Sequence, residues 1–147
     1  MLIAKKRQKR TLMNKSLKIE CDIDKLKDVR DFLERELKAC SVSEEQAGLM
    51  ILAVDEICAN LIIHSHGRDA SKELEIKFHV LHDAFLFEVY DTGKPFDPAS
   101  IAEPDIASIV NEKRKGGLGL MLVRRIMDSI ELRNENNRTV YRLRKKI

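Results

Sequence analysis

The sequence predicts an α+β two-layer sandwich, in which a mixed, mostly antiparallel sheet is covered on one face by about three helices. Two observations carry this prediction. Apolar residues recur at helical spacing in three segments, and segments of alternating polarity come in pairs that are joined by short turns. Strands joined in this way pair antiparallel, and their apolar face needs helices to cover it. The 147 residues, 44% of them hydrophobic, are expected to form a single domain, 1–147, with a flexible basic tail over residues 1–10.

The first predicted strand leads directly into the first helix. Residues 11–22 alternate loosely in polarity, which is typical of a strand. Asp22 or Asp24 then provides a side chain that can cap a helix continuing to about Cys40. The apolar stripe of this helix consists of Leu26, Val29, Leu33, Leu37 and Cys40, with Phe32 beside it.

A second helix is predicted over about 44–65. Residues 43–46 (Ser-Glu-Glu-Gln) have the form of a capping box, in which the serine hydroxyl accepts from a free backbone amide. The apolar residues that follow recur at helical spacing and are expected to face inward: Ala47, Met50, Ile51, Val54, Ile57, Cys58 and Leu61. Residues 67–69 (Gly-Arg-Asp) end the pattern.

The next segment is expected to be a hairpin followed by a long loop. Residues 74–80 and 85–90 alternate as strands around a short turn at 82–83. Residues 92–116 contain all three prolines and predict a loop-rich stretch, with one short helix near 105–112.

A third helix and a second hairpin complete the predicted fold. Two glycines at 116–117 precede a strongly apolar helix over about 118–129. Residues 130–133 and 139–143 then predict two strands around a turn at 134–137.

Basic residues are concentrated in two segments. Residues 1–18 contain seven Lys or Arg and no acidic residue, and residues 138–147 contain five more, although the formal net charge is only +3. These segments could bind nucleic acid through its phosphates. The favoured interpretation is that they are solvated edge strands, where Lys and Arg prevent sheet-to-sheet aggregation. Aromatic residues, which would stack on exposed bases, make up only 5% of the chain.

Composition also predicts the cellular compartment. The longest uncharged apolar run, residues 47–54, is far shorter than a membrane span, and the basic N-terminal segment leaves no room for a signal peptide. The three cysteines (Cys21, Cys40 and Cys58) are widely spaced and form no CxxC pair, which argues against a disulfide framework and against a zinc site. We therefore expect a cytoplasmic protein that does not contact a membrane.

Two polar residues of the second predicted helix could carry chemistry. Glu56 and Asn60 are four residues apart, so their side chains project from the same helical face. A carboxylate and a carboxamide placed there could bind a hard cation through oxygen, or accept a proton beside a metal ion. Taken alone, such a pair is more often an exposed hydrogen-bonded pair.

Two glycine-containing segments add to this pair. Residues 91–93 (Asp-Thr-Gly) directly follow a predicted strand, where the carboxylate could accept from an exocyclic amine of a flat ligand; an ordinary turn uses the same residue types. Residues 116–120 (Gly-Gly-Leu-Gly-Leu) enter the third helix, whose free amides and dipole favour a phosphate. Residues 113–115 (Lys-Arg-Lys) could add positive charge. A loop selected for tight helix packing would show the same glycines.

Together the three segments resemble the N box, the D-x-G box and the second glycine box of the GHKL ATPase superfamily, whose members share the Bergerat ATP-binding fold. Their detail narrows the resemblance to the bacterial anti-sigma factor and serine-protein kinase family. The matching residues are 53–60 with His64, 91–98, and 116–123 with Asp128. The resemblance covers about residues 11–145. It implies a protein that binds a sigma factor and phosphorylates a serine on an anti-anti-sigma protein of the STAS fold.

The resemblance also implies ATP and Mg²⁺ as cofactors and a role for individual residues. Asn60 would ligate Mg²⁺, Glu56 would be the general base, and Asp91 would accept from the adenine amino group. Residues 98–115 would form a lid over the nucleotide. The other expected ATP contacts are Gly93, Lys113, the amides of Gly117, Leu118 and Gly119, and Thr139 near the adenine pocket.

One departure from the family pattern bears on turnover. Pro95 stands where a second glycine is common in the D-x-G-x-G box, and proline would stiffen the start of the lid. The expected partners are a STAS-type protein, a sigma factor and a second copy of the chain. A nucleotide-gated interaction module without phosphotransfer and a basic nucleic-acid-binding domain stay open as alternatives. A sensor histidine kinase core is disfavoured, because the region before the N-box helix has room for only one helix. His64 and His66 are interpreted as structural residues, and we assign no metal to them.

Overall fold

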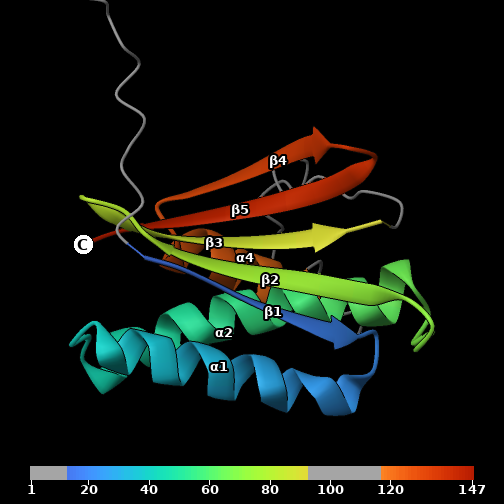
Figure 1. The fold of residues 1–147 in the computed structure, drawn as a ribbon, viewed down its shortest axis with the longest axis horizontal. Coiled ribbons are helices and arrows are strands. Elements are labelled where there is room, and N and C mark those ends of the chain that lie inside the picture. The colour runs from blue at the N-terminus through green and yellow to red at the C-terminus, as the bar shows by residue number, and fades with distance from the viewer. Residues whose placement is uncertain (1–12, 93–116) are drawn as a thin grey trace, which may run out of the picture.

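The computed structural model describes residues 13–92 and 117–147, which form a five-stranded sheet with helices packed on one face (Figure 1). The strands lie in the order β1-β2-β3-β5-β4, and every neighbouring pair is antiparallel. Their bounds are Met13–Glu20 (β1), Glu73–Val80 (β2), Ala84–Asp91 (β3), Ser129–Glu135 (β4) and Arg138–Lys146 (β5). The predicted fold class and both predicted hairpins are confirmed, and in this part of the chain the sheet is wholly antiparallel.

The first two helices follow β1. A 3₁₀ turn, η1 (Ile23–Lys25), precedes α1 (Leu26–Ala39). The Asp22 carboxylate accepts from the Asp24 amide at 2.9 Å and so caps this 3₁₀ turn, whereas the N-cap of α1 itself is Lys25, which makes no side-chain cap bond; the expectation that Asp22 or Asp24 caps the long helix is therefore wrong. The predicted helix over 44–65 consists of α2 (Glu44–Asn60) and a π-helical turn, η2 (Leu61–Ser65). The Ser43 hydroxyl accepts from the Gln46 amide at 3.2 Å, as the capping box predicts.

The third described helix, α4 (Gly117–Ile126), is shorter than predicted. The chain turns into the sheet soon after Ile126, because the Asp128 amide donates to the Arg144 carbonyl at 2.9 Å. The Asp128 carboxylate also accepts from the Lys146 amide at 2.6 Å. Through these bonds Asp128 pairs with β5 and does not continue the helix, so the expectation of a helix to 129 is wrong. The short helix expected near 105–112 lies outside the described residues.

The core lies between the sheet and the three helices. Phe85, Phe87 and Val89 of β3 alternate toward the helices, and their cross-strand partners Ile76, Phe78, Tyr141 and Leu143 are also fully buried. All predicted inward-facing residues of α1 and α2 are buried except Cys40 and Ile51, which are partly exposed. The helical spacing therefore identified most of the core correctly.

Within the part of the chain that the structure describes, one helix is long and apolar enough to span a membrane. It covers Glu44–Ser65, 22 residues with a mean hydropathy of 1.6. In this fold it is a core helix, because its inner residues, among them Val54, Ile57 and Leu61, are fully buried. Figure 1 shows it against the sheet and beside α1.

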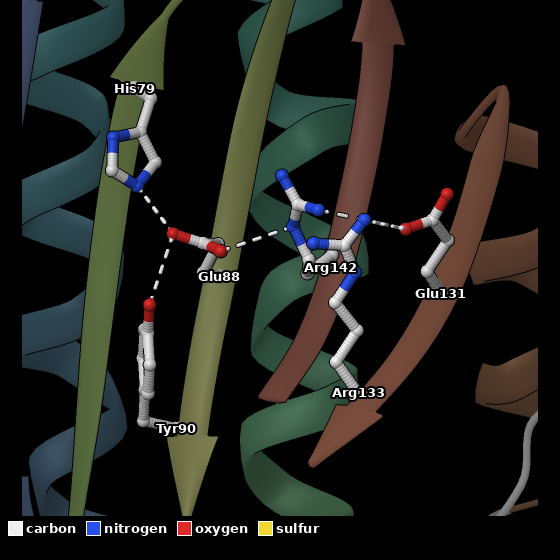
Figure 2. A network of polar contacts seen from close by, with 6 residues as sticks. All are labelled: His79, Glu88, Tyr90, Glu131, Arg133 and Arg142. Carbon is white, nitrogen blue, oxygen red and sulfur yellow. Dashed lines mark hydrogen bonds and ion pairs between the residues drawn. The ribbon is translucent and has the colours of Figure 1, made fainter. Parts of the chain in front are cut away.

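The opposite face of the sheet carries a polar network centred on Glu88 of β3 (Figure 2). Its carboxylate contacts His79 Nε2 at 2.5 Å, the Tyr90 hydroxyl at 3.3 Å and Arg142 Nε at 3.1 Å. Burial acts to raise the pKa of Glu88, but the bond and charge of His79, together with Arg142 and Tyr90, outweigh it and hold that pKa below its usual range. Burial raises the pKa of Tyr90 to about 12, and the charge of Glu88 adds to the effect. Glu88 is thus a buried, ionised carboxylate that joins three strands.

The interpretation of residues 138–147 as a solvated edge strand is wrong. Strand β5 lies between β3 and β4, and its arginines have acidic partners on β2, on β3 and in the turn before β3. Arg138 pairs with Glu75 at 3.1 Å, Arg144 pairs with Asp83 at 2.8 Å, and Arg142 is the cation held by Glu88. The basic character of this segment therefore balances buried and neighbouring carboxylates. Strand β1, in contrast, is an edge strand, as expected.

Candidate active site

The first predicted pair lies on one face of α2, as its spacing requires. Glu56 and Asn60 are both partly buried. The Asn60 amide nitrogen donates to the Glu56 carbonyl oxygen at 2.9 Å. Because this bond uses the nitrogen, the side-chain oxygen of Asn60 is directed away from the helix backbone and is the atom that suits a hard cation.

The Glu56 side chain lies directly against Gly119 in α4. A Cβ at position 119 would lie 2.6 Å from Glu56 Cδ, which is closer than any real contact of that kind. The absence of a side chain at residue 119 therefore makes the space in which the carboxylate lies. The N-box helix and the second glycine segment meet at this point, through two residues that are 63 positions apart in the sequence.

The surroundings of Glu56 favour its proton-bound form. Burial raises the pKa of its carboxyl group above the ordinary value, and the charge of neighbouring Asp55 raises it further. Asp55 itself pairs with Arg30 of α1 at 3.1 Å. A carboxylate with a raised pKa is a better proton acceptor near neutral pH, which is what a general base needs.

Asp91, at the end of β3, is completely buried. One of its carboxylate oxygens, Oδ1, contacts Nε2 of His66, whose side chain is only 5% exposed. The other oxygen, Oδ2, is buried and has no partner among the described residues. A buried acceptor without a donor is costly, and a ligand N–H that reached it would remove that cost.

Thr139 lies directly opposite Asp91 in the pairing of β5 with β3. Directly opposed residues of neighbouring strands share one face of the sheet, so Thr139 and Asp91 both face the helices. Thr139 is buried, and with Asp91 and Glu88 it belongs to the few buried polar or charged residues of the described chain. Thr139 is therefore next to Asp91 on the helix-facing side of the sheet.

Two buried thiols lie near Asp91. Burial raises the pKa of Cys21 to about 11, and the charges of Asp91 and Asp69 add to this effect. Burial also raises the pKa of Cys58 on α2, with contributions from Asp55, Cys21 and Asp91. Both thiols are therefore neutral and behave as small apolar groups beside the carboxylate. Both cysteines are free, as the sequence predicts.

The other predicted site residues are only partly covered. Gly93, Lys113, Pro95 and the lid segment 98–115 lie outside the described residues. Gly117 and Leu118 form the first turn of α4, where backbone amides have no intrahelical acceptor. Across residues 13–92 and 117–147, no group of three or more His, Cys, Asp or Glu side chains could hold a metal ion.

Comparison with known proteins agrees with this fold. The family model of the histidine kinase-like ATPase domain matches residues 19–145. The chain belongs to this family. The predicted resemblance to histidine kinase-like ATPases is thereby confirmed.

Curated relatives of this histidine kinase-like ATPase chain carry the name "Serine-protein kinase RsbW". The protein of Bacillus subtilis is 31% identical over 93 residues, which are 60% of this chain and 58% of the relative. The proteins of Bacillus cereus and Halalkalibacterium halodurans are 30% identical over 95 residues and 29% identical over 89 residues. They share 62% and 58% of this chain, and 59% and 54% of their own length. The aligned part thus spans a little over half of the curated relatives that it matches.

Two solved structures share the fold. One contains the RsbU and RsbW domains of a Mycobacterium tuberculosis protein, with a TM-score of 0.64 and 12% identity over 90% of this chain and 31% of that chain. The other is the SiaB–SiaC complex of Pseudomonas aeruginosa, with a TM-score of 0.63 and 16% identity over 95% of this chain and 90% of that chain. The sheet and its three covering helices are therefore those of the histidine kinase-like ATPase fold.

Proposed function

We propose that the chain is an ATP-binding anti-sigma regulator that phosphorylates a serine of an anti-anti-sigma protein of the STAS type. The observation that carries this proposal is the position of Glu56 against Gly119, together with a buried Asp91 whose Oδ2 has no partner among the described residues. A proton acceptor and a glycine-opened helix start suit the positioning and charge stabilisation on which phosphoryl transfer depends, and an acceptor for an amine suits the binding of adenine.

In this proposal the adenine lies against Asp91. Its free Oδ2 accepts from the exocyclic amine, which selects adenine over guanine because guanine carries a carbonyl at that position. Thr139, directly opposite in the sheet, provides a hydroxyl on the same side. Gly93 gives the base room, as the resemblance implies. An unpaired buried acceptor fits this ligand and supports the assignment.

The phosphates lie at the start of α4. The amides of Gly117, Leu118 and Gly119 are in the first turn of that helix, where anions are favoured. Lys113 adds positive charge in this scheme. Asn60 holds Mg²⁺ through its side-chain oxygen, and one protein ligand suffices because Mg²⁺ in nucleotide sites is held largely by phosphates and water. When bound, the ion neutralises charge on the phosphates.

Glu56 takes the proton of the attacking serine hydroxyl. Its raised pKa suits this task, and its position against Gly119 holds the carboxylate beside the helix start at which the phosphates bind. A positioned general base contributes about 10²–10⁴-fold to the rate. Loss of this base should therefore lower transfer by about 10²-fold or more and leave nucleotide binding in place.

The partners follow from the relatives' names and from the family resemblance. We propose a STAS-type protein as the phosphate acceptor and a sigma factor as the regulated target, with a homodimer as the assembly. The printed name "Serine-protein kinase RsbW" supports a serine acceptor. The arginines of β5 all have acidic partners, which gives a nucleic-acid-binding role little support.

The first experiment tests the nucleotide site by calorimetry with ATP, ADP and GTP, with and without Mg²⁺. We expect adenine-selective binding that Mg²⁺ strengthens, that Asp91→Asn loses, and that loses its Mg²⁺ dependence in Asn60→Ala. Absence of binding to any nucleotide would contradict the proposal.

The second experiment tests transfer to purified STAS-domain proteins of the source organism, with phosphoserine detected by mass spectrometry. Glu56→Gln should lower transfer by about 10²-fold or more with unchanged ADP affinity. Glu45→Gln, an exposed acid in the first turn of the same helix, is the matched control. If no acceptor is phosphorylated but ATP changes the affinity for a STAS protein, the chain is a nucleotide-gated interaction module.

A further inference from the structure

His66 is the residue that holds the buried carboxylate of Asp91. It follows the π-helical turn η2, and its backbone amide donates to the Leu61 carbonyl at 3.0 Å, five residues back. This wider turn directs residue 66 toward the end of β3. There its Nε2 contacts Asp91 Oδ1, and the side chains are 5% and 0% exposed. The two residues come from a helix end and a strand end that are 25 positions apart.

The contact joins a ring nitrogen to a carboxylate oxygen. In the tautomer of His66 that carries its proton on Nε2, the ring donates and Oδ1 accepts. Asp69 and two thiols of the described chain also interact with this pair. Asp69, whose carboxylate accepts from Ser71, interacts with His66, and the thiols of Cys21 and Cys58, which interact with Asp91, are neutral. In the Nε2-protonated tautomer the ring is the donor that orients Asp91.

Of the two carboxylate oxygens of Asp91, only Oδ1 has a hydrogen-bond partner among the described residues. A purely structural ion pair in a core would be expected to satisfy both carboxylate oxygens, because an unpaired buried acceptor costs stability. Here Oδ2 is buried, with no partner within residues 13–92 and 117–147. Since Oδ1 is occupied by His66, the carboxylate offers a ligand one acceptor in one orientation.

We propose that His66 is a positioning residue for adenine recognition, which fixes Asp91 so that Oδ2 is presented to the exocyclic amine. The proposal rests on the proposed function, in which Asp91 accepts from adenine. His66 lies outside the N box, the D-x-G box and the second glycine box, so it would be an additional residue of the nucleotide site. Without the imidazole, the carboxylate would rotate or take up water, and the amine would lose its aligned acceptor.

The test compares two ligands that differ by one group. ADP carries the 6-amino group, and purine riboside 5′-diphosphate lacks it. Wild-type chain should bind ADP about 10-fold or more tightly than the purine analogue, because a hydrogen bond to a buried carboxylate is lost in the analogue. His66→Phe, which keeps a ring and removes the donor, should lower ADP affinity about 5-fold or more and change affinity for the analogue less than twofold. His66→Gln, whose amide can donate, should restore part of the difference.

Controls separate this proposal from the proposed function. His82→Gln, in the exposed turn before β3, should leave both affinities unchanged. If Asp91→Asn abolishes the preference for ADP and both His66 variants retain it in full, His66 has no positioning role and the inference is overturned. If wild type shows no preference and Asp91→Asn changes nothing, the adenine role of Asp91 is wrong, and that of His66 falls with it. Should His66→Phe fail to fold by circular dichroism, His66→Ala takes its place: a fully retained preference for ADP overturns the inference, and a lost preference that His66→Gln partly restores supports it.

Discussion

Glu56 occupies the space that a side chain at Gly119 would fill. The predicted base and the start of α4 therefore cannot be changed independently: a Cβ at position 119 would lie 2.6 Å from Glu56 Cδ. The group in the way is the end of a flexible side chain, so it can move at low cost to the fold. The displaced Glu56 carboxylate would, however, leave the position that the proposed base needs.

We expect Gly119→Ala to lower phosphotransfer about 10-fold or more and to leave the folded state intact, because the methyl group displaces the Glu56 carboxylate. The measurement is the initial rate of serine phosphorylation, together with a thermal melt. Gly48→Ala is the matched control. No atom lies within 4 Å of a Cβ at Gly48, an exposed position within α2. Alanine there should raise the free energy of unfolding by about 1 kcal/mol without changing the rate. Full activity in Gly119→Ala would contradict the assignment of Glu56.

The acid limb of the pH–rate profile should depend on Asp55. Glu56 must lose its proton to act as a base, so the rate falls as the pH drops through its pKa. Burial and then the charge of Asp55 raise that pKa, so Asp55→Asn should lower it and move the acid limb to lower pH. Arg30→Met removes the 3.1 Å ion pair between Arg30 and Asp55 but keeps the charge of Asp55, so it should not move the acid limb to lower pH. Equal profiles for wild type and Asp55→Asn would refute this coupling.

Thr139→Val should weaken ADP binding about 2- to 10-fold, because valine keeps the shape and strand preference of threonine and removes the hydroxyl that faces the same side as Asp91. Thr139→Ser keeps the hydroxyl and should bind ADP nearly as wild type does. Calorimetry with ADP measures both variants. Tight binding by Thr139→Val together with weak binding by Thr139→Ser would show that packing, and not the hydroxyl, matters at this position.

Glu88 should stabilise the fold only while it is ionised. Its pKa is held below its usual range, so its contribution is present above the unfolded-state pKa of about 4.3 and is lost as the pH falls through the lowered folded-state pKa. Glu88→Gln should therefore reduce the free energy of unfolding by about 1–3 kcal/mol at pH 7 and by less at pH 3.

Urea unfolding at the two pH values measures this effect. Glu131, whose side chain is 55% exposed, contacts the same Arg142 at 3.7 Å, and Glu131→Gln should cost less than about 0.5 kcal/mol. Similar losses for the two variants would mean that the network shown in Figure 2 is a surface feature without a buried centre.

Local patterns in the sequence were sufficient to predict most helices and strands, and to predict the positions of Glu56, Asn60 and Asp91 within them. Spacing by four residues places Glu56 and Asn60 on one helical face, and a carboxylate that directly follows a strand has the position of Asp91. These relations depend only on neighbouring residues, so a single sequence contains them.

Relations between distant segments were not predictable in this way. Hairpin signals say that β4 and β5 pair, but not which of them lies beside β3. The available clue was the consecutive pair Val140 and Tyr141, both fully buried, because a strand covered on both faces does not alternate in polarity. The contact of His66 with Asp91 left no such trace, since nothing in the sequence around residue 66 specifies a partner 25 residues away.

The sheet order has a consequence for how the protein is made. Strand β3 needs β5 on its second edge, and β5 is translated after every other described element. While the ribosome is still producing the segment before residue 138, β3 keeps one bare edge and Asp91 lacks its neighbour Thr139. A nascent chain therefore exposes an aggregation-prone apolar strand and lacks one side of the proposed adenine pocket. Chaperone dependence should consequently be greatest just before β5 leaves the exit tunnel, and nucleotide should protect only chains whose synthesis has passed that point.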